Sequence, residues 1–174
     1  MRATVALLCA VLSVRAATAP LIKDIVMLKG GRLAITLENG KTEYQAVAHR
    51  PESDALGGAG TYSRFALSAD RTAAGWFTEF RWPGVNYTIP QVLTVYRPGR
   101  PLQHFGPREP DYRPMFAWVF IDGAKQVAIY RDVVHGEGKP LYELFDVASG
   151  RRVAVWDGPL TPKAPAWAAF FDGQ

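Results

Sequence analysis

The stretch that decides the fold is Ala-Trp-Val-Phe-Ile-Asp-Gly at residues 117–123, an apolar run that ends in an aspartate and a glycine. Similar runs are Arg-Phe-Ala-Leu-Ser-Ala-Asp at 64–70 and Ala-Ala-Phe-Phe-Asp-Gly at 168–173. Their aspartates, Asp70, Asp122 and Asp172, recur at about 50 residues, and a period of about 40 to 50 residues is typical of β-propeller blades. The repeat predicts architecture, because an aspartate at a strand end most simply makes a turn.

Short β-type runs separated by turn signals extend along the rest of the chain, and no stretch sustains a helical period for three turns. Asn39-Gly40 joins two alternating runs, and both central residues of such a turn tolerate positive φ, so the pair predicts a hairpin. The predicted strands are 25–28, 33–37 and 42–48, then 64–68, 73–80, 92–96 and 102–105, and then 116–121, 126–131, 141–147 and 152–156.

The last eight of these strands form two quartets that correspond to each other. Residues 97–100 in one quartet and 148–151 in the other each join the third strand to the fourth through a glycine turn. Residues 116–121 are apolar without interruption, and residues 141–145 carry apolar side chains on both faces. Strands that are covered on both sides have this composition, so we expect the quartets to be packed layers.

We therefore predict a single all-β domain at residues 17–174, with two tandem four-stranded antiparallel, blade-like sheets. Its parts are N-terminal hairpins at 17–50, blade-like units at 62–106 and 115–158, and a closing strand at 165–171. The closing strand is expected to share a sheet with the N-terminal runs. Propellers typically use four to eight blades. The sheets therefore either pair with copies of the chain in a propeller-like arrangement or pack as a sandwich or barrel.

A segment of the second unit resembles a known family. Residues 141–156 read Leu-Tyr-Glu-Leu-Phe-Asp-Val-Ala-Ser-Gly-Arg-Arg-Val-Ala-Val-Trp, with an aromatic-Asp pair, Phe145-Asp146, at the end of one strand. A Gly-Arg turn, Gly150-Arg151, opens the next strand. The segment resembles the third and fourth strands of a WD40-like propeller blade, and the resemblance covers residues 64–156. It implies repeated four-stranded blades.

The N-terminus has the features of a secretory signal: Arg2, an apolar run at 3–12, and small residues near 14–19. The run is shorter than the ~20 residues that span a bilayer, so we expect it to be removed and not to act as an anchor. Cleavage is expected after Ala16, because Pro20 disfavours cleavage after Ala19. The protein is then secreted or periplasmic.

The composition excludes several kinds of chemistry. Cys9 is the only cysteine and lies in the signal, so the mature chain has no disulfide, thiolate metal site or cysteine nucleophile. The formal charge of +4 falls to +2 without Arg2 and Arg15, and the remaining cations are scattered. Nucleic-acid binding requires a concentrated basic stripe, so we expect none. No histidine has ligand spacing, no serine lies in a nucleophile motif, and we predict no metal, cofactor or catalytic residue.

Aromatic and charged residues in two Pro- and Gly-rich loops are the candidate contact surface. Loop aromatics beside arginines are typical of binding surfaces. In the alternative interpretation these rings fold back and cap the core, as we expect of the strand tryptophans Trp76, Trp118, Trp156 and Trp167. The candidate binding residues are Trp82, Tyr87, Arg108, Asp111, Tyr112 and Arg113.

The sequence predicts an exported, non-catalytic binding module for a protein, small-molecule or glycan ligand. The module is expected to associate with itself if the sheets form a propeller-like ring. The alternative is a small secreted hydrolase, whose first candidate residues would be Asp111, His104 and His135. A third alternative is a structural subunit of a larger envelope assembly. An enzyme should have a deep pocket with converging titratable groups, whereas an assembly subunit should expose an apolar face.

Overall fold

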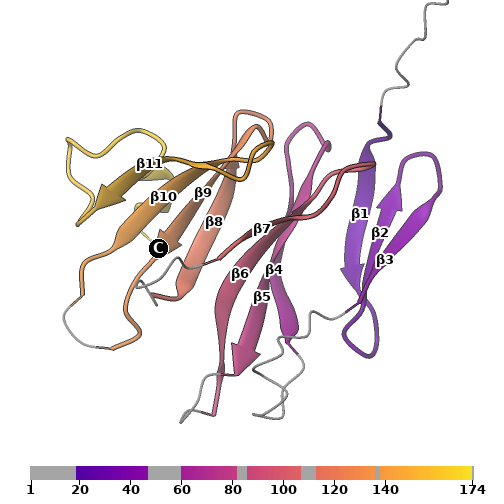
Figure 1. Cartoon of the computed structure of the whole chain (residues 1–174), viewed down its shortest axis with the longest axis horizontal. Helices are drawn as coiled ribbons and strands as arrows, with labels where there is room; N and C mark the ends of the chain where they lie inside the picture. Colours follow the sequence, from indigo (N-terminus) through magenta and orange to yellow (C-terminus); the bar gives the residue numbers. More distant parts are fainter. Residues whose placement is uncertain (1–18, 47–59, 82–85, 107–112, 136–137, 174) are drawn as a thin grey trace, which may run out of the picture.

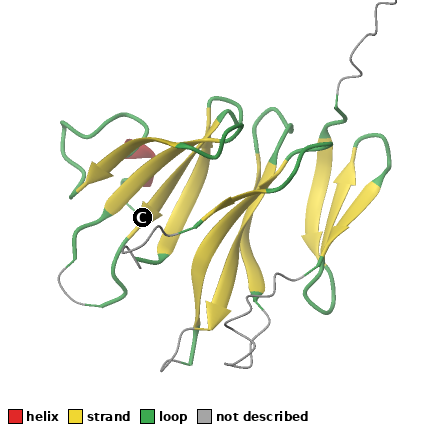
Figure 2. Ribbon diagram, viewed as in Figure 1, coloured by secondary structure: helices red, strands yellow, loops and turns green. Residues whose placement is uncertain are grey.

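The structure is a computed structural model, which describes residues 19–46, 60–81, 86–106, 113–135 and 138–173. These residues form three antiparallel β-sheets and one short 3-10 helix (Figure 1, Figure 2). None of the three sheets closes on itself. Within the described ranges, no helix has the length and apolar character needed to cross a bilayer. The predicted all-β class is confirmed.

Each sheet is a meander in which the strands pair in the order of the chain. The first sheet contains β1 (Ile22–Met27), β2 (Leu33–Leu37) and β3 (Thr42–Gln45). The second contains β4 (Thr61–Leu67), β5 (Ala74–Arg81), β6 (Thr88–Tyr96) and β7 (Gln103–Phe105). The third contains β8 (Met115–Ile121), β9 (Gln126–Arg131), β10 (Leu141–Asp146) and β11 (Arg152–Asp157). The two predicted quartets are therefore the second and third sheets.

Glycines with positive φ close the predicted hairpins. Gly40 has a φ of 84° and donates its N–H to the carbonyl of Leu37 at 2.9 Å, as expected for the Asn39-Gly40 turn. Gly99 and Gly150 have φ values of 72° and 68° in the turns that join the third and fourth strands of their sheets. The correspondence between these two turns is confirmed, because both use a left-handed glycine at the same place.

The sheets are stacked face to face, with the second sheet in the middle of the stack (Figure 1). One apolar cluster, which includes Leu33 and Trp76, fills the space between the first and second sheets. Another, which includes Leu93 and Ile129, fills the space between the second and third. Polar bonds also cross these interfaces: the Tyr96 hydroxyl donates to Glu43 at 2.9 Å, and Trp118 Nε1 donates to the Arg64 carbonyl at 3.0 Å.

Strands β9 and β10 of the third sheet are buried on both faces, as the continuous apolar runs predicted, whereas Val153 and Val155 of β11 are exposed. Phe145 faces the second sheet, whereas Tyr142 and Leu144 belong to a cluster on the outer face. The tryptophans contribute unequally to the core. Trp76 is fully buried, while Trp118 and Trp156 are partly buried against the clusters beside them.

The predicted closing strand at 165–171 is wrong. This segment forms turns and the 3-10 helix Ala169–Phe171, which lies against the outer face of the third sheet and joins no sheet. Ala168 and Phe171 are buried, whereas Phe170 is 61% exposed. A spacing of three residues places Ala168 and Phe171 on one side of a 3-10 helix, whereas a strand would bury alternate residues. Trp167 accordingly lies in a turn, partly buried against the same cluster.

Gly75 of β5 is expected to tolerate no side chain. A Cβ atom there would lie 2.5 Å from Cη2 of Trp118, whose ring is also held by its bond to Arg64. Gly75→Ala should therefore displace the indole and destabilise the protein by about 1 to 3 kcal/mol, as overpacked cores do. Urea unfolding measures the loss.

Gly106 provides the control for this substitution. A Cβ atom at Gly106 would lie 3.8 Å from the Gln91 carbonyl oxygen, which is an ordinary contact. Gly106→Ala should change the free energy of unfolding by less than about 1 kcal/mol. Equal stabilities for the two variants would contradict the packing of Trp118 on Gly75.

Candidate functional site

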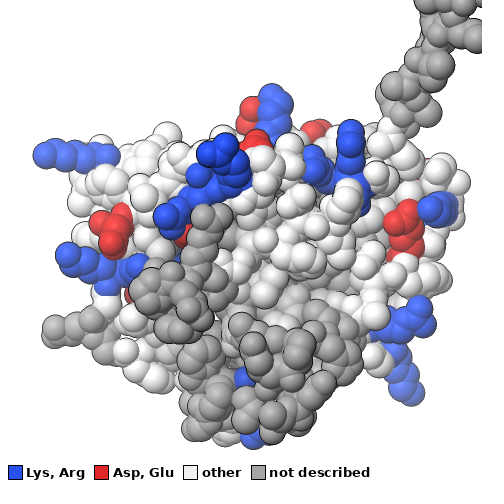
Figure 3. Space-filling view, viewed as in Figure 1, with Lys and Arg blue, Asp and Glu red and all other residues white. Residues whose placement is uncertain are grey.

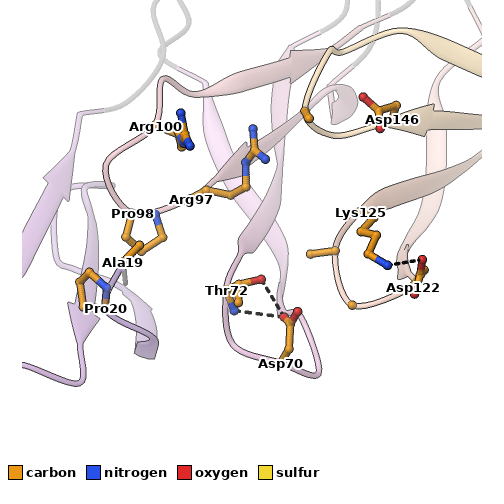
Figure 4. A pocket seen from close by; sticks show the side chains of 13 residues that line it. Ala19, Pro20, Asp70, Thr72, Arg97, Pro98, Arg100, Asp122, Lys125 and Asp146 are labelled. Atoms are coloured by element: carbon orange, nitrogen blue, oxygen red, sulfur yellow. Dashed lines mark hydrogen bonds and ion pairs between the residues drawn. The ribbon is translucent and has the colours of Figure 1, made fainter. Parts of the chain in front are cut away.

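A cleft of about 740 Å³ lies at the end of the stack where the hairpin turns of the second and third sheets meet (Figure 4). Four connections contribute to it: those between β4 and β5, β6 and β7, β8 and β9, and β10 and β11. Its charged lining residues are Asp70, Arg97, Arg100, Asp122, Lys125 and Asp146.

The turn between β4 and β5 holds Asp70 through its neighbours. Oδ1 of Asp70 accepts hydrogen bonds from the Ser68 hydroxyl at 2.7 Å and from the Thr72 hydroxyl at 2.8 Å. It also accepts the Thr72 N–H at 3.1 Å. Some loss of hydration raises the pKa of Asp70, but these hydrogen bonds outweigh it and hold the pKa below its usual value. Asp70 is therefore a fixed negative charge at the cleft.

The turn between β8 and β9 has an unusual backbone. Asp122, Gly123 and Ala124 have consecutive positive φ values of 49°, 60° and 74°, in the left-handed region that L residues rarely adopt. Lys125 Nζ lies 2.9 Å from Oδ2 of Asp122, and both side chains are exposed. A Cβ atom at Gly123 would lie 2.9 Å from Oδ2 of Asp70. Glycine at this position therefore lets the carboxylate of Asp70 approach the next sheet.

Arg97, Arg100 and Asp146 come from the remaining two connections. Arg97 Nη2 donates to the Val147 carbonyl at 3.4 Å and so links the second and third sheets. Hydrogen bonds from Ser149, at 2.5 Å from its hydroxyl and 2.7 Å from its N–H, lower the pKa of Asp146, and the charge of Arg97 adds to this effect. Arg100 is exposed.

The cleft combines three carboxylates with three cations, and this decides what it can do chemically. Among the described residues, no group of three or more metal-ligating side chains is arranged to hold a metal ion. Among the described lining residues there is no histidine, serine or cysteine, and the hydroxyl of Thr72 is hydrogen-bonded to Asp70. Charged side chains of both signs suit the binding of charged groups.

Of the predicted binding residues, the structure describes two. Tyr87 is 40% exposed just before β6. Arg113 donates to the Lys139 carbonyl at 2.7 Å and lies 3.8 Å from Asp157, so it connects the start of β8 to the end of β11. Neither lines the cleft. The other four lie outside the described residues: Trp82, Arg108, Asp111 and Tyr112.

The two histidines considered for a hydrolase also lie away from the cleft. His104 is in β7, where its Nδ1 lies 3.1 Å from the Thr94 hydroxyl, and partial burial lowers the pKa of the imidazole. His135 is exposed in the connection between β9 and β10. Asp111, the third candidate, lies outside the described residues.

Sequence reasoning assigned Asp70 and Asp122 to turns and missed that their turns share a cleft. Both do lie in hairpin turns, while Asp172 follows the 3-10 helix. Their repetition was the available signal: equivalent turns of stacked equivalent sheets lie at the same end of the stack. The repeated turn at 97–100 likewise could have predicted that Arg97 and Arg100 lie at this end of the stack.

The fold and the cleft place the chain among all-β proteins built of stacked antiparallel meanders. No model of a known protein family matches the chain. A search of curated proteins likewise finds no significant match.

Asp70 should make the stability of the protein depend on acid pH. The pKa of Asp70 in the folded state lies below the ordinary value of 3.8. The stability that the ionised carboxylate contributes is therefore present above pH 3.8 and is lost as the pH falls through the folded-state pKa. We expect a contribution below about 1 kcal/mol, because the side chain is exposed. Asp70→Asn should reduce the loss of unfolding free energy between neutral and strongly acidic pH. Asp172→Asn is the control. If it reduced the acid-dependent loss of unfolding free energy as much as Asp70→Asn does, the effect would not come from the hydrogen bonds of Asp70.

Proposed function

We propose that the protein is an exported, non-catalytic binding module that holds a ligand carrying both positive and negative groups. The lining of the cleft carries this proposal, since three carboxylates and three cations from four connections surround one space of about 740 Å³. Asp70 and the Asp122–Lys125 pair face it from neighbouring turns (Figure 4). Fixed charges of both signs favour a ligand with complementary charges and disfavour ligands with one sign only.

The distribution of charge supports a local recognition site over a general polyanion surface. Lys and Arg side chains occur in separate groups on the face shown in Figure 3, with acidic side chains beside several of them. A partner with one sign of charge would meet repulsion as well as attraction on such a surface. The proposed ligand is therefore a zwitterionic small molecule or a mixed-charge peptide segment.

A titration with the dipeptide lysylglutamate tests the ligand class. In a ¹H–¹⁵N spectrum of the mature protein, the peptide should shift the amide signals of Asp70, Gly123 and Lys125 in a saturable way. Dilysine and diglutamate should cause much smaller shifts at equal ionic strength. Equal shifts with all three peptides, or none at the cleft, would contradict the proposed ligand class. Release of free lysine and glutamate would instead favour the hydrolase.

Arg100→Glu and Arg151→Glu separate the cleft from the general charge of the molecule. Both arginines are exposed in neighbouring connections, but only Arg100 lines the cleft. Arg100→Glu should weaken binding of lysylglutamate by about tenfold or more, equivalent to roughly 1.4 kcal/mol. Arg151→Glu should leave binding nearly unchanged. Equal effects of the two variants would show that the cleft is not the site.

Export is part of the proposal and has its own test. The small residues at Val14 and Ala16, followed by Pro20, predict that the mature protein begins at Ala17. The intact mass of the protein recovered outside the cytoplasm should therefore correspond to residues 17–174. A mass that includes Met1 would contradict both the signal and the localisation.

A further inference from the structure

The stack of sheets is covered differently at its two ends. The outer face of the third sheet is covered by the 3-10 helix, through Ala168 and Phe171. The first sheet stands at the other end of the stack (Figure 1). Its inner face is buried by the cluster that includes Leu33, Ile35 and Leu37. Its outer face carries the alternate residues of the same strands, among which Val26 and Tyr44 are exposed.

This outer face is apolar at its centre. Val26, Ala34 and Tyr44 lie side by side on β1, β2 and β3, because Val26 pairs with Ala34 and Ala34 pairs with Tyr44. Val26 is 42% exposed and Tyr44 is 55% exposed, whereas Ala34 between them is buried, so the two larger side chains form the accessible surface. Leu28, which continues the row of Val26 beyond the end of β1, is 38% exposed. Adjacent apolar side chains on the open face of a sheet are typical of an interaction surface.

Opposite charges flank the apolar centre, toward the two ends of the strands. At one end the Arg32 guanidinium lies 5.1 Å from the centre of the Tyr44 ring. At the other end Asp24 pairs with Thr36, which pairs with Thr42, so these three residues share the outer face. The Asp24 carboxylate accepts a hydrogen bond from the Ile25 N–H at 2.8 Å.

We propose that the outer face of the first sheet binds the same face of a second copy of this chain. A two-fold axis near Ala34 would place the apolar centres of the two faces together. If this axis runs across the strands, it reverses their direction and brings Arg32 of each copy toward the partner's Asp24. Such an isologous contact requires a self-complementary surface, and this face has the apolar centre and the opposite charges that it needs.

The size of the face predicts a weak dimer. With strands about 4.8 Å apart and a rise of about 3.3 Å per residue, three strands of five residues cover roughly 250 Å². A stable interface buries about 800 Å² per partner. The dimer should therefore dissociate on dilution and form at high concentration. Face-to-face packing of this kind already joins the first sheet to the second within one chain.

Sedimentation velocity of the mature protein over a wide range of concentration tests the proposal. The wild-type protein should shift from monomer to dimer as its concentration rises. Val26→Asp and Tyr44→Lys should each raise the dissociation constant by about tenfold or more. Val153→Asp is the matched control, because Val153 is 51% exposed but lies on the other end sheet. A monomer at every concentration, or a dimer that Val153→Asp weakens as much as Val26→Asp does, would overturn the proposal.

Charge reversal provides a second measurement that does not depend on apolar burial. Asp24→Arg and Arg32→Asp should each weaken the dimer, and the double variant should recover most of the loss, because it restores opposite charges across the two-fold axis. Thermal melts should confirm that the variants remain folded, since both side chains lie on the surface. A double variant no stronger than the single variants would overturn the two-fold arrangement.

Discussion

Glu143→Gln should lower the free energy of unfolding by about 3 to 5 kcal/mol, which is the usual loss when one partner of a buried ion pair is removed. Arg131 Nε lies 2.6 Å from Oε2 of Glu143, and the two side chains are only 2% and 5% exposed. Without the carboxylate, the guanidinium would remain buried with no opposite charge beside it. Urea unfolding at neutral pH measures the effect.

Arg152 provides the control for this prediction. It also bonds to Glu143, at 2.8 Å, but its side chain is 39% exposed. Arg152→Gln should therefore cost no more than about 1 kcal/mol, as for most exposed ion pairs. The double variant Arg131→Met with Glu143→Leu should recover much of the stability, because it removes both buried charges. A loss below about 1 kcal/mol for Glu143→Gln would contradict the buried pair.

Phe171→Ala should destabilise the protein by about 3 to 5 kcal/mol, which is the range for truncating a buried phenylalanine. The Phe171 ring lies 5.8 Å from Tyr142 and 6.0 Å from Tyr130, and these two tyrosines stack on each other at 5.1 Å. Their burial raises the pKa of both phenol groups. Loss of the phenylalanine would leave this apolar face of the third sheet open to water.

Phe170→Ala is the matched control, because the neighbouring ring is 61% exposed. It should change the free energy of unfolding by no more than about 0.5 kcal/mol. Removal of residues 165–174 should cost at least as much as Phe171→Ala, since it removes the whole cover of the sheet. Equal effects of the two phenylalanine variants, measured by thermal and urea unfolding, would contradict the 3-10 helix as the cover.

The C-terminal segment shows where sequence patterns stop being informative. Residues 168–171 read as a short apolar run, which fits a strand or a buried turn equally well. The choice depends on what the segment can reach in three dimensions. A 3-10 turn buries Ala168 and Phe171 together against Tyr130 and Tyr142, which belong to strands more than 25 residues away. A distant contact of this kind has no signature in the local sequence.

The sequence by itself determined the all-β class, the two quartets and the position of most hairpins. These features are local: alternation selects strands, and turns such as Asn39-Gly40 and those at Gly99 and Gly150 need residues that tolerate positive φ. Only the tertiary structure decided the rest. Face-to-face stacking brings Asp70 to Gly123 and Arg97 to Val147, and so forms the cleft from turns about 50 residues apart. The same stacking leaves Val26 and Tyr44 exposed on the outer face of the first sheet, because which sheet stands last depends on packing and not on any single strand.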